Sequence, residues 1–282
     1  MCYHGSEMES LKELGQRTLI MGILNVTPDS FSDGGLYFDR ERAIAHGLEL
    51  VEEGADIIDV GGESTRPGAA PVPTKEELCR VIPVIEFLRK ETDVVISIDT
   101  YKANVAAAAL AAGAGMVNDI SALRFDGEMI DVLIRYDVPI VLMHMQGRPQ
   151  TMQESPQYND VVLDIIEFLR ERIAAAAAAG ISKKRLIIDP GIGFGKLLKH
   201  NLEILRRLDE FKDLGRPILI GPSRKSFIGQ LTGAPLKERL PGTIASIVLG
   251  IIKGAEIVRV HDVREAQQAI QVADAIIRGD LR

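Results

Sequence analysis

VVISID, residues 94–99, is an apolar run that ends in an acid, and other runs of the chain also end in polar groups. These runs are LIMGILN (19–25), MVND (116–119), RLIID (185–189) and EIVRVH (256–261). Enzymes with a (β/α)8 barrel place their sites at the carboxyl ends of buried strands, where acids, amides and bases are needed. The pattern therefore predicts both a fold and the place of the chemistry.

Strand-like and helix-like segments alternate along the whole chain. We expect strands at 19–25, 56–61, 94–99, 115–120, 139–144, 185–189, 217–221 and 257–261. We expect helices at 40–53, 74–91, 102–112, 127–136, 158–179, 199–212, 238–253 and 263–278. The alternation favours a parallel sheet covered by helices. The number of units favours a closed α/β TIM barrel, although an open doubly wound sheet remains the alternative. We predict a single barrel domain at 18–282 after an N-terminal tail at 1–17.

The composition fits one large domain without a nucleic-acid or membrane partner. The chain has 282 residues, is 46% hydrophobic and carries a formal net charge of -7. An acidic balance gives no indication of nucleic-acid binding. No apolar stretch approaches the roughly 18 residues of a membrane span, and the N-terminus does not resemble a secretion signal. We therefore expect a cytoplasmic protein.

Side chains alternate between the two faces of a strand, which allows the inward positions to be predicted. Ser97 and Asp99 share one face, and Arg259 and His261 share another, whereas the residues between them are branched and apolar. The polar faces are expected to point into the barrel. In PIVLMH (139–144) the alternation does not decide whether Met143 or His144 points inward.

Two acids and an amide are expected at one barrel mouth. Asp99 and Asp189 end strands, and Asn118 lies between them in sequence. Carboxylates accept hydrogen bonds and an amide both donates and accepts, so this set suits a flat heterocycle with amino and ring N–H donors. For each acid taken alone, a helix cap or a salt bridge at the rim is the alternative.

Cationic side chains follow the last two strands. Arg224 and Lys225 lie in GPSRKSF (221–227), and Arg259 and His261 lie in the last strand. TIM barrels often hold phosphate with the loops after strands seven and eight. The sequence thus predicts several cationic donors in one quadrant, with separate solvated charges as the alternative for the two loop residues.

Two loops offer further ligands, and a third is a misleading resemblance. Asn25 opens NVTPDSFSDGG, where its amide oxygen and Asp33 suit Mg²⁺, although both are also common turn residues. GGESTRPGAAP (61–71) is a loop bounded by glycine and proline that carries Thr65 and Arg66. The alternative is that these are ordinary loop residues without a binding role. PGIGFGKL (190–197) fails the phosphate-loop pattern, because Pro190 and Leu197 stand where Gly and Ser or Thr are needed.

Seven segments together resemble one enzyme family. They are MGILNVTPDSFSDGG (21–35), DIIDVGGESTRPGA (56–69), SIDT (97–100), VNDIS (117–121), IIDPGIGFGK (187–196), GPSRKSFIG (221–229) and VRVHDV (258–263). In order and spacing they resemble the pterin-binding motifs of the dihydropteroate synthase family, from about residue 18 to the C-terminus. The resemblance implies a TIM barrel that is usually a homodimer and a target of sulfonamides.

The resemblance also implies a reaction and a set of site residues. The reaction joins (7,8-dihydropterin-6-yl)methyl diphosphate to p-aminobenzoate with Mg²⁺, and gives 7,8-dihydropteroate and diphosphate for folate biosynthesis. The pterin set would be Asp99, Asn118, Met143, Asp189, Phe194, Lys225 and Arg259. The diphosphate set would be Asn25, Arg66, Arg259 and His261. The p-aminobenzoate set would be Phe31, Thr65, Arg66, Pro67, Lys225 and Ser226. Asn25 would bind the metal, with Asp33 as a further ligand. The catalytic groups would be Asp99, Lys225, Arg259 and His261.

Three other functions are alternatives to this one. A pterin-binding methyltransferase domain, which passes a methyl group from a folate to a corrinoid protein, would keep the acids and the amide. It would have little use for a diphosphate set. A barrel that binds pterin or phosphate without catalysis, and an unrelated phosphate-binding barrel enzyme, are the remaining alternatives.

Overall fold

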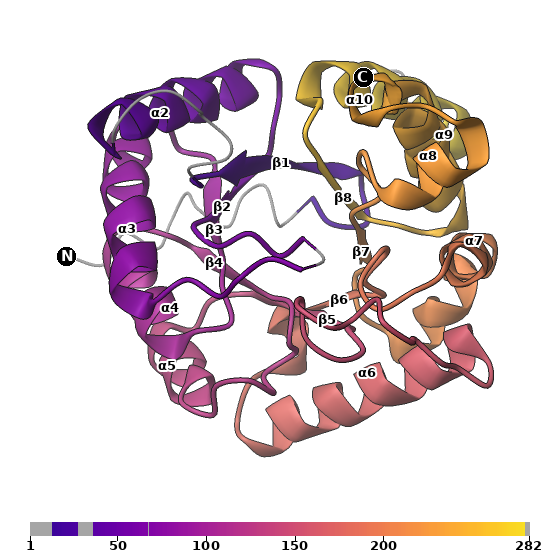
Figure 1. Cartoon of the computed structure of the whole chain (residues 1–282), viewed down its shortest axis with the longest axis horizontal. Coiled ribbons are helices and arrows are strands. Elements are labelled where there is room, and N and C mark those ends of the chain that lie inside the picture. Colours follow the sequence, from indigo (N-terminus) through magenta and orange to yellow (C-terminus); the bar gives the residue numbers. More distant parts are fainter. Residues whose placement is uncertain (1–12, 28–35, 67, 280–282) are drawn as a thin grey trace.

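Eight parallel strands form the centre of the molecule (Figure 1). The computed structural model describes residues 13–27, 36–66 and 68–279. The strands are β1 (Leu19–Asn25), β2 (Ile57–Gly61), β3 (Val95–Asp99), β4 (Met116–Asp119), β5 (Ile140–Met143), β6 (Leu186–Asp189), β7 (Leu219–Ile220) and β8 (Ile257–Val260). Their order is β6-β5-β4-β3-β2-β1-β8-β7, and the bridge between Ile188 and Ile218 brings the two end strands together. The sheet therefore closes on itself, and the predicted TIM barrel is confirmed against the open sheet.

Helices surround the strands on the outside of the barrel (Figure 1). The α-helices are α2 (Leu36–Glu52), α3 (Thr74–Glu91), α4 (Ala103–Ala111), α5 (Met129–Tyr136), α6 (Val161–Ala178), α7 (Leu198–Arg206), α8 (Ser226–Thr232), α9 (Leu240–Lys253) and α10 (Val263–Arg278). Short 3-10 helices are η2 (Lys183–Arg185), η3 (Leu208–Leu214) and η4 (Leu236–Glu238). None of the helices formed by the described residues is long and apolar enough to cross a membrane.

Two predicted elements differ from the structure. The helix expected at 199–212 is α7 followed by the tighter η3, with Arg207 between them at ψ 26°. The short α8 was not predicted, because seven residues with a glycine among them show too little periodicity to be recognised. The boundary proposed between a tail at 1–17 and the barrel stays a prediction, since residues 1–12 lie outside the described part of the chain.

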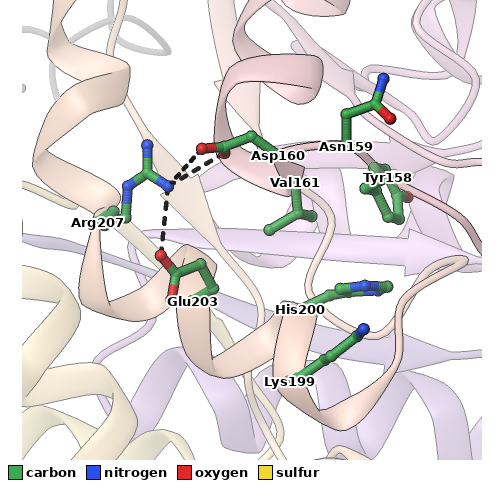
Figure 2. Close-up of a pocket in the computed structure, with 8 residues that line it drawn as sticks. All are labelled: Tyr158, Asn159, Asp160, Val161, Lys199, His200, Glu203 and Arg207. Carbon is green, nitrogen blue, oxygen red and sulfur yellow. Dashed lines mark hydrogen bonds and ion pairs between the residues drawn. The ribbon is translucent and has the colours of Figure 1, made fainter.

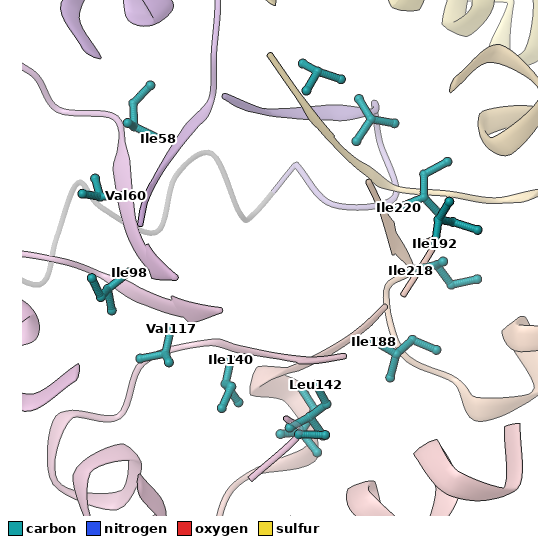
Figure 3. Packing of buried hydrophobic residues seen from close by; sticks show 14 of the residues in the cluster. Ile58, Val60, Ile98, Val117, Ile140, Leu142, Ile188, Ile192, Ile218 and Ile220 are labelled. Atoms are coloured by element: carbon teal, nitrogen blue, oxygen red, sulfur yellow. The ribbon is translucent and has the colours of Figure 1, made fainter. Parts of the chain in front are cut away.

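The strands divide the core into an outer layer and an inner plug. Branched residues such as Ile58, Ile98 and Val117 point away from the barrel axis and pack against the helices (Figure 3). On the inward face, a separate apolar cluster fills the amino-terminal half of the barrel. Its members are Leu19, Met21, Ile57, Val95, Met116, Val141, Ile187, Leu219 and Ile257. The interior is therefore closed below, and only the carboxyl ends of the strands are available for a site.

Strand register places the polar residues of the inner face in two rows. Asn25 pairs with Gly61, Gly61 with Asp99, and Asp99 with Asn118, which makes one row at the rim. One row lower, Asp59 pairs with Ser97. The polar groups thus lie directly above the apolar plug.

Candidate active site

A cleft of about 470 Å³ opens at the carboxyl ends of the strands. Among the predicted site residues it is lined by Asn25, Thr65, Arg66, Asp99, Phe194, Lys225, Ser226, Arg259 and His261. Met143 packs in one apolar cluster with Phe194. Phe31, Asp33 and Pro67 lie outside the described residues, so their predicted roles stay predictions. Segments far apart in the sequence therefore converge on one mouth.

Arg259 is the central group of this site. It projects from β8 and donates from Nε to Asp59 Oδ2 at 2.6 Å and from a terminal nitrogen to Asp99 Oδ2 at 2.7 Å. Burial alone would lower the pKa of Arg259, but the two carboxylates outweigh it and the net shift is upward. The guanidinium is therefore a fixed positive charge that bridges β2 and β3.

Asp59 is a site residue that the sequence analysis missed. It is fully buried on β2, and its Oδ2 also accepts a hydrogen bond from Asn118 Nδ2 at 2.9 Å. It therefore orients both Arg259 and Asn118. The signal was available in DIIDVG (56–61), because Asp59 has the same parity as the inward Ile57. The prediction considered only the last residues of each strand, whereas Asp59 lies one register row deeper.

The two predicted acids are buried and resist ionisation. Burial raises the pKa of Asp99 to about 7, even though Arg259 acts in the opposite direction. Burial also raises the pKa of Asp189 to about 6, and one of its oxygens accepts the Gly191 N–H at 2.7 Å. Asp99 Oδ1 is buried and has no hydrogen-bond partner among the described residues. An unpaired acceptor on a residue that lines the cleft is suited to a ligand N–H.

Lys225 faces the same acids from the loop after β7. Its Nζ lies 4.1 Å from the centre of the Phe194 ring, a cation–π contact. Burial lowers the pKa of Lys225 to about 8, and the nearby Arg259 adds to the effect. Asp189 and Asp99 act in the opposite direction and keep the ammonium charged at neutral pH.

His261 is not the cation that the sequence analysis expected. Burial, with Arg259 nearby, lowers its pKa to about 3, so the imidazole is neutral at pH 7. Its Nδ1 lies 2.9 Å from Ser223 Oγ. Arg224, the other predicted cation, turns to Asp262 in an ion pair. The cationic quadrant therefore consists of Arg66, Lys225 and Arg259, with His261 as a neutral partner at its edge.

The structure also decides between Met143 and His144. Met143 has the inward parity of Val141, whereas His144 is held by Lys196, whose Nζ lies 2.9 Å from His144 Nδ1. Lys196 Nζ also donates to the Phe194 carbonyl at 2.9 Å, and burial lowers the pKa of this lysine well below its usual value. Lys196 is therefore committed to fixing the glycine-rich loop after β6, which agrees with the rejection of that loop as a phosphate loop.

A second hollow lies between α6 and α7, away from this cleft (Figure 2). Three of its charged side chains are paired with one another, as Arg207 contacts both Asp160 and Glu203. Asp160 in addition caps α6 by accepting from Val162 N and Leu163 N. Lys199 is a further cation in this hollow, but its lining contains none of the buried acids found at the barrel mouth.

Comparisons with known proteins agree with this site. A family model described as pterin binding enzyme matches residues 21–261. Dihydropteroate synthase of Synechocystis sp. is 50% identical over 271 residues, which cover 96% of this chain and 94% of that protein. The structure of Yersinia pestis dihydropteroate synthase with a sulfonamide drug matches with a TM-score of 0.89 and 46% identity, and covers 94% of this chain and 96% of that one. Xanthomonas albilineans dihydropteroate synthase in complex with 7,8-dihydropteroate matches with a TM-score of 0.84 and 49% identity, over 92% and 94% of the two chains.

The barrel with buried acids, amide and arginine at its mouth defines a pterin-binding enzyme. Since both the family model and the relatives cover most of its length, the chain belongs to the dihydropteroate synthase family. The resemblance stated from the motifs is thereby confirmed.

Proposed function

We propose that this barrel joins (7,8-dihydropterin-6-yl)methyl diphosphate to p-aminobenzoate and releases 7,8-dihydropteroate and diphosphate. The observation that carries the proposal is Arg259, held between Asp59 and Asp99 beside Lys225 at the cleft, with Asn118 donating to the same Asp59. It places hydrogen-bond acceptors for a heterocycle next to positive charge for a leaving group. The relatives from Xanthomonas albilineans and Yersinia pestis, which bind 7,8-dihydropteroate and a sulfonamide, support the same substrates.

The pterin ring would lie on the inward face of β3, β4 and β6. Asp99 Oδ1 and Asp189 can accept the ring and amino N–H groups, while the Asn118 amide is oriented by Asp59. Met143 and Phe194 supply apolar surface for the ring faces. Lys225 donates to a ring acceptor, because three N–H groups of an ammonium can serve several partners at once.

The reaction is a displacement at the methylene carbon. The bond from this carbon to the diphosphate oxygen breaks, a bond to the amine nitrogen forms, and the amine proton is released. An aromatic amine attacks through its lone pair, so no strong base is required, and the site acts by stabilising separated charge. Arg66 and Arg259 would take up the negative charge on the diphosphate, with His261 as a neutral hydrogen-bond partner. Asp99 would offset positive charge that spreads into the pterin.

Magnesium fits this mouth as a companion of the diphosphate. Asn25 brings a neutral amide oxygen to the cleft, and oxygen is the donor that Mg²⁺ prefers. The described residues contain no cluster of three or more His, Cys, Asp or Glu side chains that could hold a metal alone. That agrees with an ion held by Asn25, by the substrate phosphates and by water, with Asp33 as a predicted further ligand. When bound, the ion neutralises charge on the leaving group.

The second substrate would enter beside Lys225. Thr65, Arg66 and Ser226 line this side of the cleft, and Phe31 and Pro67 are proposed to complete it. Arg66 suits the carboxylate or the diphosphate, since a guanidinium binds either with two hydrogen bonds. Loops that cover the mouth would exclude water, which otherwise competes for the activated methylene.

We also propose a cytoplasmic homodimer. Large apolar side chains are exposed on α9 and α10, which lie side by side in Figure 1, among them Leu249, Ile252, Val272 and Ile276. Exposed apolar surface of this kind marks a contact with another protein. Sedimentation equilibrium of Ile252→Glu tests the dimer: a monomer supports an interface on this face, and an unchanged dimer places it elsewhere.

One coupling assay tests the function. The protein is mixed with the pterin diphosphate and labelled p-aminobenzoate, with and without Mg²⁺. Labelled dihydropteroate that requires Mg²⁺ supports the proposal, and formation without the metal removes magnesium from it. Methyl transfer to a corrinoid protein in place of this product would support the methyltransferase reading, which the relatives do not favour.

A further inference from the structure

The loop after β2 carries Thr65 and Arg66 into the cleft, and its two ends are fastened to each other. Glu63, at the start of the loop, accepts a hydrogen bond from Val72 N at 3.0 Å. Lys102, from the β3–α4 connection, donates from Nζ to Glu63 at 2.6 Å and to the Val72 carbonyl at 2.6 Å. We call Glu63, Val72 and Lys102 the loop clamp.

The clamp centres on a buried carboxylate and is further supported by neighbours. Glu63 is 8% exposed, and its second oxygen accepts the Tyr101 hydroxyl at 2.8 Å. Lys102 also contacts Glu77 of α3, which is 1% exposed and accepts from Thr100. Burial alone would lower the pKa of Lys102, but its hydrogen bonds to Glu63 and Glu77 outweigh burial and raise it. The ammonium therefore stays charged.

The far part of the loop is fixed by a different loop. Gly68 N donates to the Pro149 carbonyl at 3.1 Å, and Gln150 Nε2 donates to the Ala69 carbonyl at 3.1 Å. These two hydrogen bonds join neutral groups, so each contributes little. The clamp consists instead of hydrogen bonds to charged groups, two of which end on the buried Glu63 carboxylate, and such bonds are stronger.

We propose that Glu63 and Lys102 are positioning residues for the second substrate, because they close the loop that presents Thr65 and Arg66 to it. Neither side chain lines the cleft, and neither contacts the buried acids that would hold the pterin. Loss of the clamp should therefore weaken the binding of p-aminobenzoate without changing recognition of the pterin ring. This inference rests on the proposed function.

Glu63→Gln and Glu77→Gln form a matched pair of variants. Each removes one buried carboxylate charge from the same lysine, but only Glu63 contacts the loop. For Glu63→Gln we expect the KM for p-aminobenzoate to rise about tenfold or more, with a smaller fall in kcat, because the loop also carries Arg66, which is proposed to take up charge on the diphosphate. Binding of the hydroxymethyl dihydropterin, which lacks the diphosphate, should be unchanged. Glu77→Gln should lower the unfolding midpoint and leave that KM within about twofold.

Hydrogen exchange of the Val72 amide gives a readout that does not depend on catalysis. Its exchange should be faster in Glu63→Gln than in Glu77→Gln, because only Glu63 accepts this N–H. Tyr101→Phe removes one neutral hydrogen bond from Glu63 and serves as the mild variant if Glu63→Gln does not fold. It should raise the same KM about twofold to threefold.

Equal effects of Glu63→Gln and Glu77→Gln on the KM, or no effect of either, would overturn the inference. An unchanged KM in a folded Tyr101→Phe, with Val72 exchange as in wild type, would do the same. If the wild-type protein forms no dihydropteroate, the proposed function fails. The exchange of Val72 still decides in that case whether the clamp holds the loop.

Discussion

Replacing Asp189 by asparagine should make the protein more stable at pH 8. Burial raises the pKa of this acid from 3.8 to about 6, a shift of about 2 units, and each unit is worth about 1.4 kcal/mol. An acid with a raised folded-state pKa favours folding fully below its unfolded pKa and loses that contribution as the pH rises through the folded value. At pH 8 the ionised carboxylate therefore costs the folded state about 3 kcal/mol. Asparagine avoids this cost but accepts the Gly191 N–H less strongly, which returns about 1 kcal/mol. The expected net gain is about 2 kcal/mol.

Urea denaturation at pH 8 and pH 4 measures this difference. The gain should be present at pH 8 and should be largely lost near pH 4, where the acid is protonated in the folded state and about half protonated in the unfolded state. Asp160→Asn is the control, because hydrogen bonds from the Leu163 amide and from Arg207 lower the pKa of this surface acid. It should lose stability at pH 8. The reasoning is wrong if Asp189→Asn is less stable than wild type at pH 8, or if its gain is the same at both pH values.

Three further changes test single contacts of the site. Asp59→Asn leaves Arg259 with one carboxylate partner, which should cost about 2–3 kcal/mol of transition-state stabilisation. We therefore expect kcat/KM for the pterin diphosphate to fall about 30- to 150-fold. A value within threefold of wild type contradicts this. In the wild type, kcat/KM should fall as the pH drops through about 7, where Asp99 is protonated, and Asp99→Asn should abolish that dependence. A rate near wild type for Asp99→Asn at saturating substrates would remove the carboxylate from the mechanism. Gly191→Ala should destabilise the fold by about 2 kcal/mol or more, because φ is +71° and the added Cβ would lie 2.0 Å from the His144 carbonyl; thermal unfolding at wild-type temperature would disprove it.

Strand periodicity predicted the inward face of this barrel because it depends only on local geometry. The apolar residues that flank Arg259 pack outward, and Asp99 and Asn118 meet in one register row, as alternation required. At β5 alternation alone could not decide which side chain points inward, because either Met143 or His144 could serve in a site. The choice depends on Lys196, which comes from a different strand connection and reaches His144 only in the folded chain.

The charge states of the site residues were harder to predict than their positions in the barrel. A neutral His261 could not be predicted from the sequence, since its lowered pKa arises from burial and from Arg259 beside it. The inward position of Asp59 follows from strand parity, but its role depends on contacts with β4 and β8 that form only in the folded chain. Properties that depend on which groups become neighbours, and on how much water remains around them, require the tertiary structure.

Several charged groups of the candidate site lack full sets of polar partners in the free protein, and this follows from what the site has to bind. Asp99 and Asp189 are acids that burial makes harder to ionise, and burial makes Lys225 harder to protonate. Each of these groups lowers the stability of the free protein at neutral pH. The apolar plug below and the helices outside supply the burial that holds them in place. A ligand that brings N–H donors to the acids and an acceptor to the lysine restores the missing partners. A polar heterocycle that partners these groups should therefore bind more tightly than an apolar ring of the same shape, which would leave them unpaired.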